Sequence, residues 1–283
     1  MESVVELKRG EVIAIDGKTL RRSHDKSCGK DAIHIISAFA TENNVVCGQI
    51  KTNEKSNEIT AIPKLLDLLF IEGCIVTIDA MGCQKDIAEK IIDNKADYVL
   101  ALKGNQKNLY EDVKLFLDNM LSKKTLDIEY DNYKTVTKDH GRIEKRNYYI
   151  TDKIEWLNGR PEWKGLKTIG VAISEITIDE RKTLEKRYYI SSLELDAEKF
   201  GNAVRKHWNV ESFHWILDVN FREDYCRARK DYEAENMAVA RHMAVNLLKR
   251  DKTSRLSIEK KRYKCVLNTN YLSKIIFGDY KNG

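Results

Sequence analysis

Two short apolar runs in this chain each end at an aspartate. The runs are Val12-Ile-Ala-Ile-Asp16 and Ile75-Val-Thr-Ile-Asp79. Continuous Val and Ile, without alternating polar residues, are typical of strands that are buried on both faces of a sheet. A carboxylate at the end of such a strand is held rigidly at the rim of the sheet, where it can meet a second one. We therefore expect Asp16 and Asp79 to lie close together.

The segments around these runs alternate between strand and helix patterns. The expected strands cover 11–16, 32–40, 44–52, 74–79 and 98–102. The second and third form a hairpin through the turn-rich tetrad 41–44. Apolar residues at helical spacing predict helices over 57–70, through Ile87 to Ile92, and from a cap at Asn105 to about Leu121. This order favours an α/β fold, in which helices cover a sheet that contains parallel strands.

The pattern changes after the first third of the chain. Residues 127–193 are rich in Tyr, Thr, Ile, Lys and Arg, which predicts a β-rich insertion. Within it, Glu144-Lys-Arg-Asn-Tyr-Tyr-Ile is echoed by Glu185-Lys-Arg-Tyr-Tyr-Ile. We interpret the echo as two similar strands placed against each other. Helical patterns return after Asp196, one through about Val219 and another over about 232–249. The expected parts are therefore 1–125, 126–195, 196–250 and a basic tail over 251–283.

Composition sets few limits on function. The chain has 283 residues and a formal net charge of +5, which permits a polyanionic partner without requiring one. No apolar run approaches the ~20 residues that a membrane span needs, and the N-terminus lacks a secretion signal. We expect a cytoplasmic protein with no membrane partner. The six cysteines contain no C-x-x-C pair, so we expect reduced, mostly buried thiols.

A third carboxylate lies in the helical segment His207-Trp-Asn-Val-Glu211-Ser-Phe-His214-Trp. At helical spacing, His207, Glu211, His214 and Asp218 share one arc beside an apolar stripe. Glu211 could instead form a surface pair with a histidine one turn away. The His-x₃-Glu-x₂-His spacing also resembles a zinc site, but no further Cys or His ligand is evident.

Asp16, Asp79 and Glu211 together provide a hard oxygen site suited to Mg²⁺, and two such ions can clamp a phosphodiester. Each aspartate alone could be a turn or cap residue. It is the combination of two carboxylates at a sheet rim with a third on an amphipathic helix that favours a functional interpretation. The sequence thus predicts a metal-dependent enzyme that cuts and joins nucleic-acid strands.

Six ordered blocks carry a family resemblance. They are Ile13–Arg22, Thr77–Lys85, Asp97–Gln106, His140–Glu144, Tyr189–Leu193 and Arg205–Asp224. Over about residues 11 to 250 the chain resembles the H-repeat-associated transposases of bacterial insertion sequences, a branch of the DDE transposases. The resemblance implies a ribonuclease H-like mixed sheet flanked by helices, with the β-rich insertion before the last catalytic helix. Residues 1–125 and 196–250 would then form the catalytic core.

The resemblance also assigns roles. Asp16, Asp79 and Glu211 would be the catalytic triad and the ligands of two Mg²⁺ ions, with Mn²⁺ as a substitute. The partner would be double-stranded DNA, both element ends and target, bound by a homodimer. Residues expected to contact DNA are Lys18, Arg21, Arg22, Lys103, His140, Arg142, Arg146, His207 and His214. A solvated loop or a salt-bridged sheet surface would explain the basic residues equally well. Trp208 and Trp215 are expected to pack.

One departure from the family pattern keeps other functions open. The family carries a longer helical region before the first aspartate, presumed to recognise element ends, whereas here fifteen residues precede Asp16. The chain could therefore be a truncated, catalytically silent protein that binds DNA or regulates a full-length transposase. A ribonuclease H-like nuclease without a joining step is a third possibility.

Overall fold

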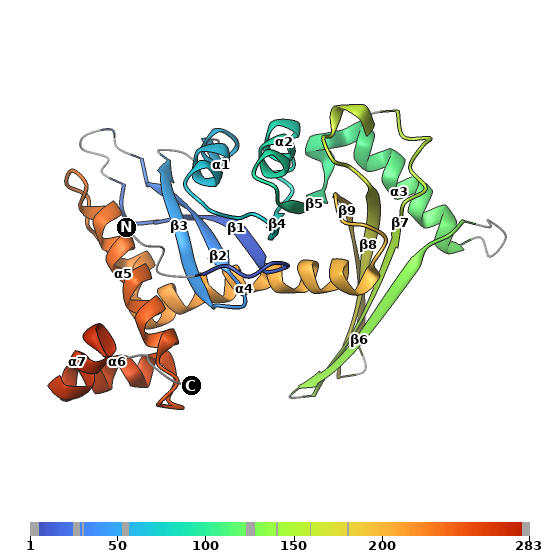
Figure 1. The fold of residues 1–283 in the computed structure, drawn as a ribbon. Helices are drawn as coiled ribbons and strands as arrows, with labels where there is room; N and C mark the ends of the chain where they lie inside the picture. Colours follow the sequence, from blue (N-terminus) through green and yellow to red (C-terminus); the bar gives the residue numbers. More distant parts are fainter. Residues whose placement is uncertain are drawn as a thin grey trace.

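A single mixed sheet organises the molecule. The computed structural model describes residues 6–24, 29, 31–52, 57–122, 128–139, 141–158, 160–179 and 181–278. The strands are β1 (Val12–Thr19), β2 (His34–Ala40), β3 (Val45–Thr52), β4 (Ile75–Ile78), β5 (Asp97–Leu102), β6 (Asp131–Asp139), β7 (Arg142–Thr151), β8 (Thr168–Ile178) and β9 (Arg181–Ser191). They form one sheet of nine strands in the order β3-β2-β1-β4-β5-β9-β8-β7-β6 (Figure 1). The predicted mixed sheet is confirmed.

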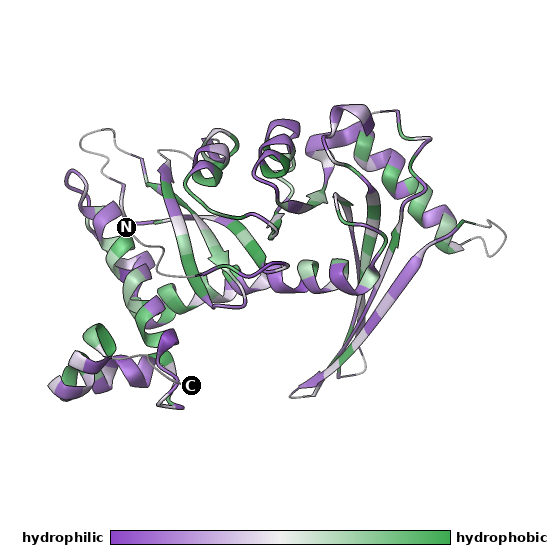
Figure 2. Cartoon of the chain, viewed as in Figure 1, coloured by the Kyte–Doolittle hydropathy of each residue, from purple (hydrophilic) through white to green (hydrophobic). Residues whose placement is uncertain are grey.

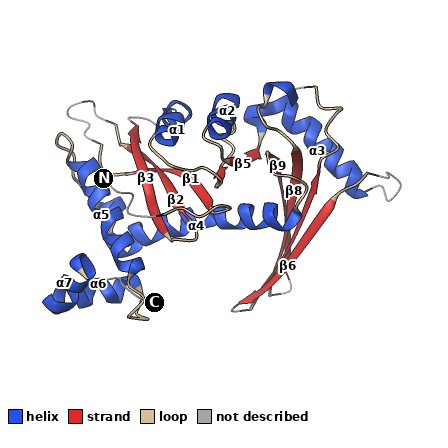
Figure 3. Cartoon of the chain, viewed as in Figure 1, coloured by secondary structure: helices blue, strands red, loops and turns tan. Residues whose placement is uncertain are grey.

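Helices cover both faces of this sheet (Figure 3). They are α1 (Glu58–Asp67), α2 (Lys85–Asp93), α3 (Lys107–Ser122), α4 (Ala197–Phe221), α5 (Glu233–Arg250), α6 (Ile258–Leu267) and α7 (Thr269–Phe277), with short 3₁₀ turns η3 (Gly104–Gln106), η4 (Arg160–Glu162) and η5 (Glu223–Tyr225). In Figure 1, α1 and α2 lie on one side of the first strands, and α4 crosses beneath them on the other.

Alternation along β1 explains this two-sided covering. Ile13 and Ile15 belong to the large core that contains buried residues of α1, α2 and α3. Val12 and Ala14 face the other way and join clusters with residues of α4. Successive side chains of a strand point to opposite faces, so a continuous apolar run fits a strand buried on both. The interpretation of the Val12–Ile15 run as a buried strand is confirmed.

The β-rich segment continues the same sheet. β5 pairs with β9 in antiparallel register, and β9, β8, β7 and β6 follow as antiparallel neighbours. Only the ends near β5 are buried, and the far ends extend past α4 in Figure 1. The edge strand β6 is largely hydrophilic in Figure 2. All four strands fall within 126–195, although the boundaries of the four expected parts stay a prediction.

Two details of the sequence interpretation were wrong. The similar segments at Glu144 and Glu185 do not pair with each other, because β8 lies between β7 and β9. Asn105 does not cap a helix either, since it lies inside η3 and α3 begins after it. Its side-chain amide instead donates a hydrogen bond of 2.5 Å to the carbonyl of Ala80. This bond links the turn after β5 to the loop that follows Asp79.

A buried aspartate holds the C-terminal helices. Asp251 is 2% exposed, and its carboxylate accepts hydrogen bonds from the Tyr271 hydroxyl at 2.7 Å and from the Thr253 hydroxyl at 2.6 Å. The Lys261 ammonium lies 3.5 Å from the same carboxylate. Burial acts to raise the pKa of Asp251, but these donors outweigh it and lower the pKa to about 2. The expected basic tail therefore contains two helices fixed to α5.

This cluster predicts a pH-dependent stability. The folded pKa lies below the ordinary aspartate pKa of 3.8, so the ionised carboxylate stabilises the fold above pH 4, and this contribution disappears as the pH falls from 4 to 2. Asp251→Asn should lower the free energy of unfolding by about 2 kcal/mol at pH 7. Urea titration of parent and variant should show the difference shrinking between pH 4 and pH 2. Asp112→Asn on α3 is the exposed control, and equal stability of parent and Asp251→Asn at pH 7 would contradict the prediction.

Candidate active site

β1 and β4, two neighbouring strands of the sheet, place two aspartates at the same level. The strands are parallel, and their register pairs Ile15 with Ile78. The next residues along the chain are Asp16 and Asp79, so the two carboxylates leave neighbouring strands at the same level. Asp16 faces the side that α4 covers, because the adjacent Ile15 points into the opposite core. The strand expected to end at Asp16 continues to Thr19, so Asp16 lies inside β1 and not at its end, whereas Asp79 directly follows β4.

The polar arc of α4 lies against these two strands. His214 Nδ1 is 3.4 Å from Asp16 Oδ2, and His207 Nδ1 is 3.1 Å from Thr77 Oγ1. Glu211 lies between the two histidines on the same helical face, because residues three and four apart are neighbours on a helix. The apolar stripe at Val210, Phe213 and Leu217 is fully buried. This packing orients the polar arc toward β1 and β4.

All three candidate carboxylates line one cavity of about 470 Å³. Asp16 comes from β1, Asp79 from the end of β4 and Glu211 from α4. Lys103, just after β5, lines the same cavity, as does Arg187 of β9. Segments that are remote in sequence therefore converge here on one site.

Charges within this cavity influence one another. Burial acts to raise the pKa of Asp16, but His214 and His207 outweigh it and the pKa is lowered. The pKa of Glu211 is raised by partial burial and then by the negative charge of Asp16. Burial lowers the pKa of His207, although Asp16 and Asp79 oppose this. Like-charged carboxylates that share a site show this mutual influence.

The donor chemistry of the cavity fits a hard divalent cation. Three carboxylates from three elements supply the oxygen ligands that Mg²⁺ prefers. Asp79 is oriented by its own loop, since its Oδ1 accepts backbone hydrogen bonds from Met81 at 3.0 Å and Gly82 at 3.4 Å. Among the described residues, however, no three His, Cys, Asp or Glu side chains are close enough together to hold an ion as they stand.

Lys18 lies in a different environment from the one expected. Its ammonium is 2.5 Å from Asp218 and 2.7 Å from Glu223. Burial acts to lower the pKa of Lys18, but these carboxylates outweigh it and raise the pKa. Arg21 pairs with Asp224 at 3.2 Å. The ion pairs explain Lys18 without a DNA contact.

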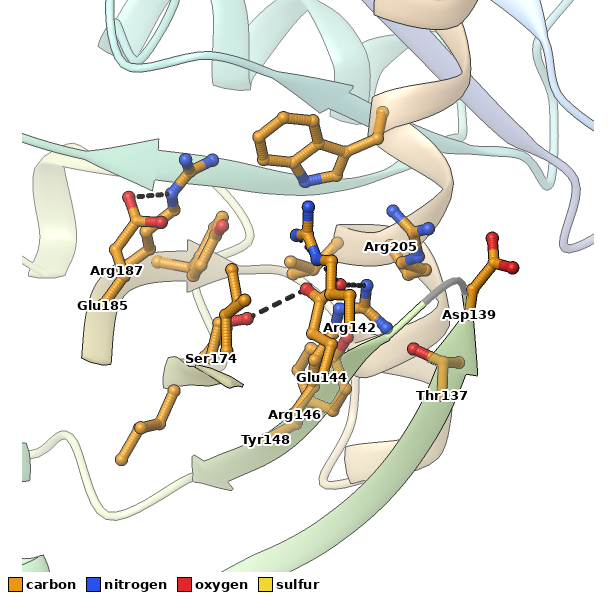
Figure 4. A pocket seen from close by; sticks show the side chains of 16 residues that line it. Thr137, Asp139, Arg142, Glu144, Arg146, Tyr148, Ser174, Glu185, Arg187 and Arg205 are labelled. Carbon is orange, nitrogen blue, oxygen red and sulfur yellow. Dashed lines mark hydrogen bonds and ion pairs between the residues drawn. The ribbon is translucent and has the colours of Figure 1, made fainter. Parts of the chain in front are cut away.

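A basic cavity of about 540 Å³ shares lining residues with the cavity that holds the three carboxylates. Figure 4 shows the side chains that line it. Its lining includes four arginines from three elements, namely Arg142 and Arg146 of β7, Arg187 of β9 and Arg205 of α4. We call this cavity the arginine groove. Arginine forks suit phosphate oxygens, and phosphate contacts position nucleic acids. The expected pair Arg142 and Arg146 lies in the groove.

Glutamates orient the arginines of the groove. Glu144 lies 2.5 Å from Arg146 and 3.3 Å from Arg142, and it accepts a hydrogen bond of 3.1 Å from Ser174. These partners hold the pKa of Glu144 below its ordinary value, although its burial acts to raise it. The guanidinium groups are thereby fixed before any ligand arrives.

Arg187 joins the two cavities. It lines both, as do Trp208 and Glu185. The Arg187 guanidinium lies over the Trp208 ring, 4.7 Å from its centroid, and its Nε donates a hydrogen bond of 2.8 Å to Glu185. The negative charge of Glu211 also acts on Arg187. A phosphate chain in the arginine groove would therefore continue directly into the carboxylate cavity.

The comparisons with known proteins agree with this geometry. A model of the family described as "Transposase DDE domain" matches residues 7–247, most of the chain. The chain belongs to the DDE transposase family. It is 48% identical over 274 residues to the "H repeat-associated putative transposase YhhI" of Escherichia coli K12, covering 95% of this chain and 72% of that protein. It is also 46% identical over 282 residues to the "Putative transposase YncI" of E. coli O157:H7, covering 98% of this chain and 71% of the relative.

Family membership confirms the resemblance seen in the sequence and the ribonuclease H-like fold class. Such transposases act on DNA and generally use divalent metal ions. No helix in the described part of this transposase is long and apolar enough to cross a bilayer.

The remaining expected DNA contacts lie in several places. Arg21 is largely exposed, and Arg22 lies over the Tyr225 ring, 5.1 Å from its centroid. Lys103 lines the carboxylate cavity and directly follows β5, the strand that pairs with β9. His140 lies outside the described residues.

Sequence reasoning missed Arg187 and Arg205 of this transposase. The signal for Arg187 was the echo, because Glu185, Arg187 and Tyr189 repeat the period-two pattern of β7 and line the same groove. Arg205 lies on α4 before His207, and no pattern in the sequence marked it as a site residue.

The expectation that both tryptophans pack was wrong. Trp208 is 36% exposed and lies in the groove wall, and Trp215 is 62% exposed.

Gly17 permits the close packing behind Asp16. A Cβ at this position would lie 2.2 Å from His34 Nε2 and 2.7 Å from Glu58 Oε1. His34 and Glu58 are themselves buried partners, 2.6 Å apart. The absence of a side chain thus lets β1 approach this pair.

Gly17→Ala should therefore lower the free energy of unfolding by about 1–3 kcal/mol through overpacking. The matched control is Gly104→Ala, where the added Cβ would meet nothing within 4 Å. Chemical denaturation of both variants checks the prediction. If the Gly17→Ala protein were as stable as the Gly104→Ala protein, the prediction would be wrong, and His34 and Glu58 would have moved to accommodate the added methyl group.

Proposed function

We propose that this chain catalyses Mg²⁺-dependent cleavage and strand transfer of DNA at insertion-sequence ends, with Mn²⁺ as a substitute ion. The observation that carries the proposal is the convergence of Asp16, Asp79 and Glu211 on one cavity that continues into the arginine groove. An acidic centre beside a basic groove suits a reaction at a phosphodiester. The groove neutralises the polyanion, and the acidic centre holds the cations that the reaction needs.

The chain's own residues would position the reacting groups. Asp16, Asp79 and Glu211 would hold two divalent ions. Such ions lower the pKa of an attacking water or 3′-hydroxyl and stabilise the leaving 3′-oxygen. The attacking oxygen displaces the 3′-oxygen in line at phosphorus, so the same site serves hydrolysis and then joining. His214 keeps Asp16 oriented, and His207 fixes α4 to β4 through Thr77.

The DNA would run from the carboxylate cavity along the arginine groove. Arg142, Arg146, Arg187 and Arg205 would contact phosphates, as would Lys103 in the carboxylate cavity. Arg21 and Arg22 remain proposed contacts outside these cavities, and His140, which is not among the described residues, also remains a proposed contact. We further propose that the protein acts on double-stranded DNA as a homodimer, since transposition joins two element ends to one target.

Removing any of the three carboxylates should stop the reaction. Asp16→Asn, Asp79→Asn and Glu211→Gln should each slow metal-dependent nicking by at least about 10²-fold, because each removes a charge that holds the cations. Nicking of DNA that carries an element end is measured on gels with Mg²⁺ or Mn²⁺. Asp86→Asn, an exposed carboxylate on α2, is the control and should retain the parent rate.

If all three carboxylate variants nicked DNA at the parent rate, the assignment of the catalytic triad would be wrong. If the parent bound DNA in a salt-dependent way without cleavage in either metal, the chain would be a silent DNA-binding protein. Cleavage without transfer of a pre-cut 3′ end would identify a nuclease.

The arginine groove makes a separate prediction about DNA affinity. Arg205→Ala and Arg142→Ala should each weaken DNA binding across sequences and reduce the slope of log affinity against log salt by about 1, since each contact releases a counterion. The control is Lys64→Ala, an exposed residue on α1, which covers the opposite face of the sheet. Fluorescence anisotropy at several salt concentrations measures both quantities. Unchanged slopes for both arginine variants would exclude the groove as the path of the DNA.

A further inference from the structure

Lys18 is enclosed by acidic groups close to the candidate active site. It follows Asp16 by two residues on β1, and its side chain is only 12% exposed. Its ammonium lies 2.5 Å from Asp218 Oδ1, 2.7 Å from Glu223 Oε2 and 3.6 Å from Asp224 Oδ1. Three carboxylates thus surround one ammonium. The local charge is negative, which would repel a phosphate rather than attract it.

These carboxylates come from the end of α4 and the turn beyond it. The helix ends at Phe221, and Arg222 adopts a left-handed conformation with φ of 49°. This reversal places Glu223 and Asp224 in η5, beside Asp218 of the last turns of α4. The Glu223 side chain is 1% exposed and the Lys18 side chain 12% exposed. Lys18 is therefore the cation that a buried carboxylate requires at this place.

The spacing of the contacts indicates what the cluster does. Asp16 and Lys18 are two residues apart on a strand, which is about 6.8 Å along β1. Their partners His214 and Asp218 are four residues apart on a helix, which is about 6 Å along α4. The pairs Asp16–His214 and Lys18–Asp218 therefore connect β1 and α4 at two successive points, and the distance between these points is nearly the same along the strand and along the helix. Glu211 lies about one helical turn before His214, the α4 residue of the first pair.

We propose that Lys18 is a positioning residue, whose ion pairs with Asp218 and Glu223 fix α4 along β1 and thereby set the separation of Asp16 from Glu211. The effect of Lys18 on DNA cleavage rests on the proposed function, whereas its effect on the position of α4 along β1 does not. In this account Lys18 contributes nothing to DNA affinity, in contrast to the role expected from the sequence.

The experiment separates positioning from DNA contact. Lys18→Met removes the cation but leaves Glu223 buried without a partner. A second variant, Lys18→Met with Glu223→Gln, removes the ion pair without that unpaired charge and keeps the test valid if the single variant does not fold. Lys64→Met is the matched control, because it makes the same change at an exposed lysine on α1, on the opposite face of the sheet.

We expect the double variant to bind DNA with the parent's affinity and salt slope. Its cleavage rate at saturating DNA should fall by about 10²-fold, the scale of a misplacement of about 1 Å. Lys64→Met should cleave at the parent rate. A reduced salt slope with normal cleavage at saturating DNA would make Lys18 a DNA contact and overturn the proposal, as would a double variant with the parent's rate.

A crystal structure of the double variant gives a readout that does not depend on activity. The contact between His214 and Asp16, 3.4 Å in the parent, should open, and Glu211 should move relative to Asp16. An unchanged arrangement would overturn the positioning role. If the parent cleaved nothing, the proposed function would fail, and the crystal structure alone would decide the role of Lys18.

Discussion

The packing of α4 against β1 is the interaction on which the site depends. Neither element carries the candidate triad alone: β1 supplies Asp16, and α4 supplies Glu211. They are held face to face by a buried apolar stripe on α4 and by the polar contacts His214–Asp16 and Lys18–Asp218 beside it, while His207 contacts Thr77 of the neighbouring β4. Apolar burial provides the stabilising free energy, and the polar contacts fix how the helix lies along the strand.

The mixed character of the sheet explains why acidic and basic groups adjoin. Parallel strands β1 and β4 place Asp16 and Asp79 at the same level of the sheet. β9 then pairs antiparallel with β5 and delivers Arg187 beside the same cavity. A separate insertion domain would have needed its own core and a hinge. Extending the existing sheet instead keeps the arginine groove rigidly placed relative to the carboxylates.

The similar segments in β7 and β9 were recognised in the sequence, but the expectation that they lie against each other in the sheet was wrong. Both segments present Glu, Arg and Tyr with period two, so both place these side chains on one face of the sheet. Their separation by β8 was not encoded in the similarity itself. The strand between them carries Ala172 and Ser174 where β7 and β9 carry larger side chains, and all three line the groove. Small residues between two rows of arginines leave the space that a ligand needs.

The sequence by itself determined the buried strands and the helical arc of α4, because these depend on local periodicity. It also indicated the candidate triad, because carboxylates suit metal ions in any fold. It could not determine which charges would meet. Lys18 looked like a free cation beside Asp16, and only the folded chain shows the carboxylates of α4 and η5 around it. Arg187 and Trp208 likewise gained a place in the site only through the pairing of β9 with β5. Long-range ion pairs and strand order are decided by packing between distant segments, which local patterns do not specify.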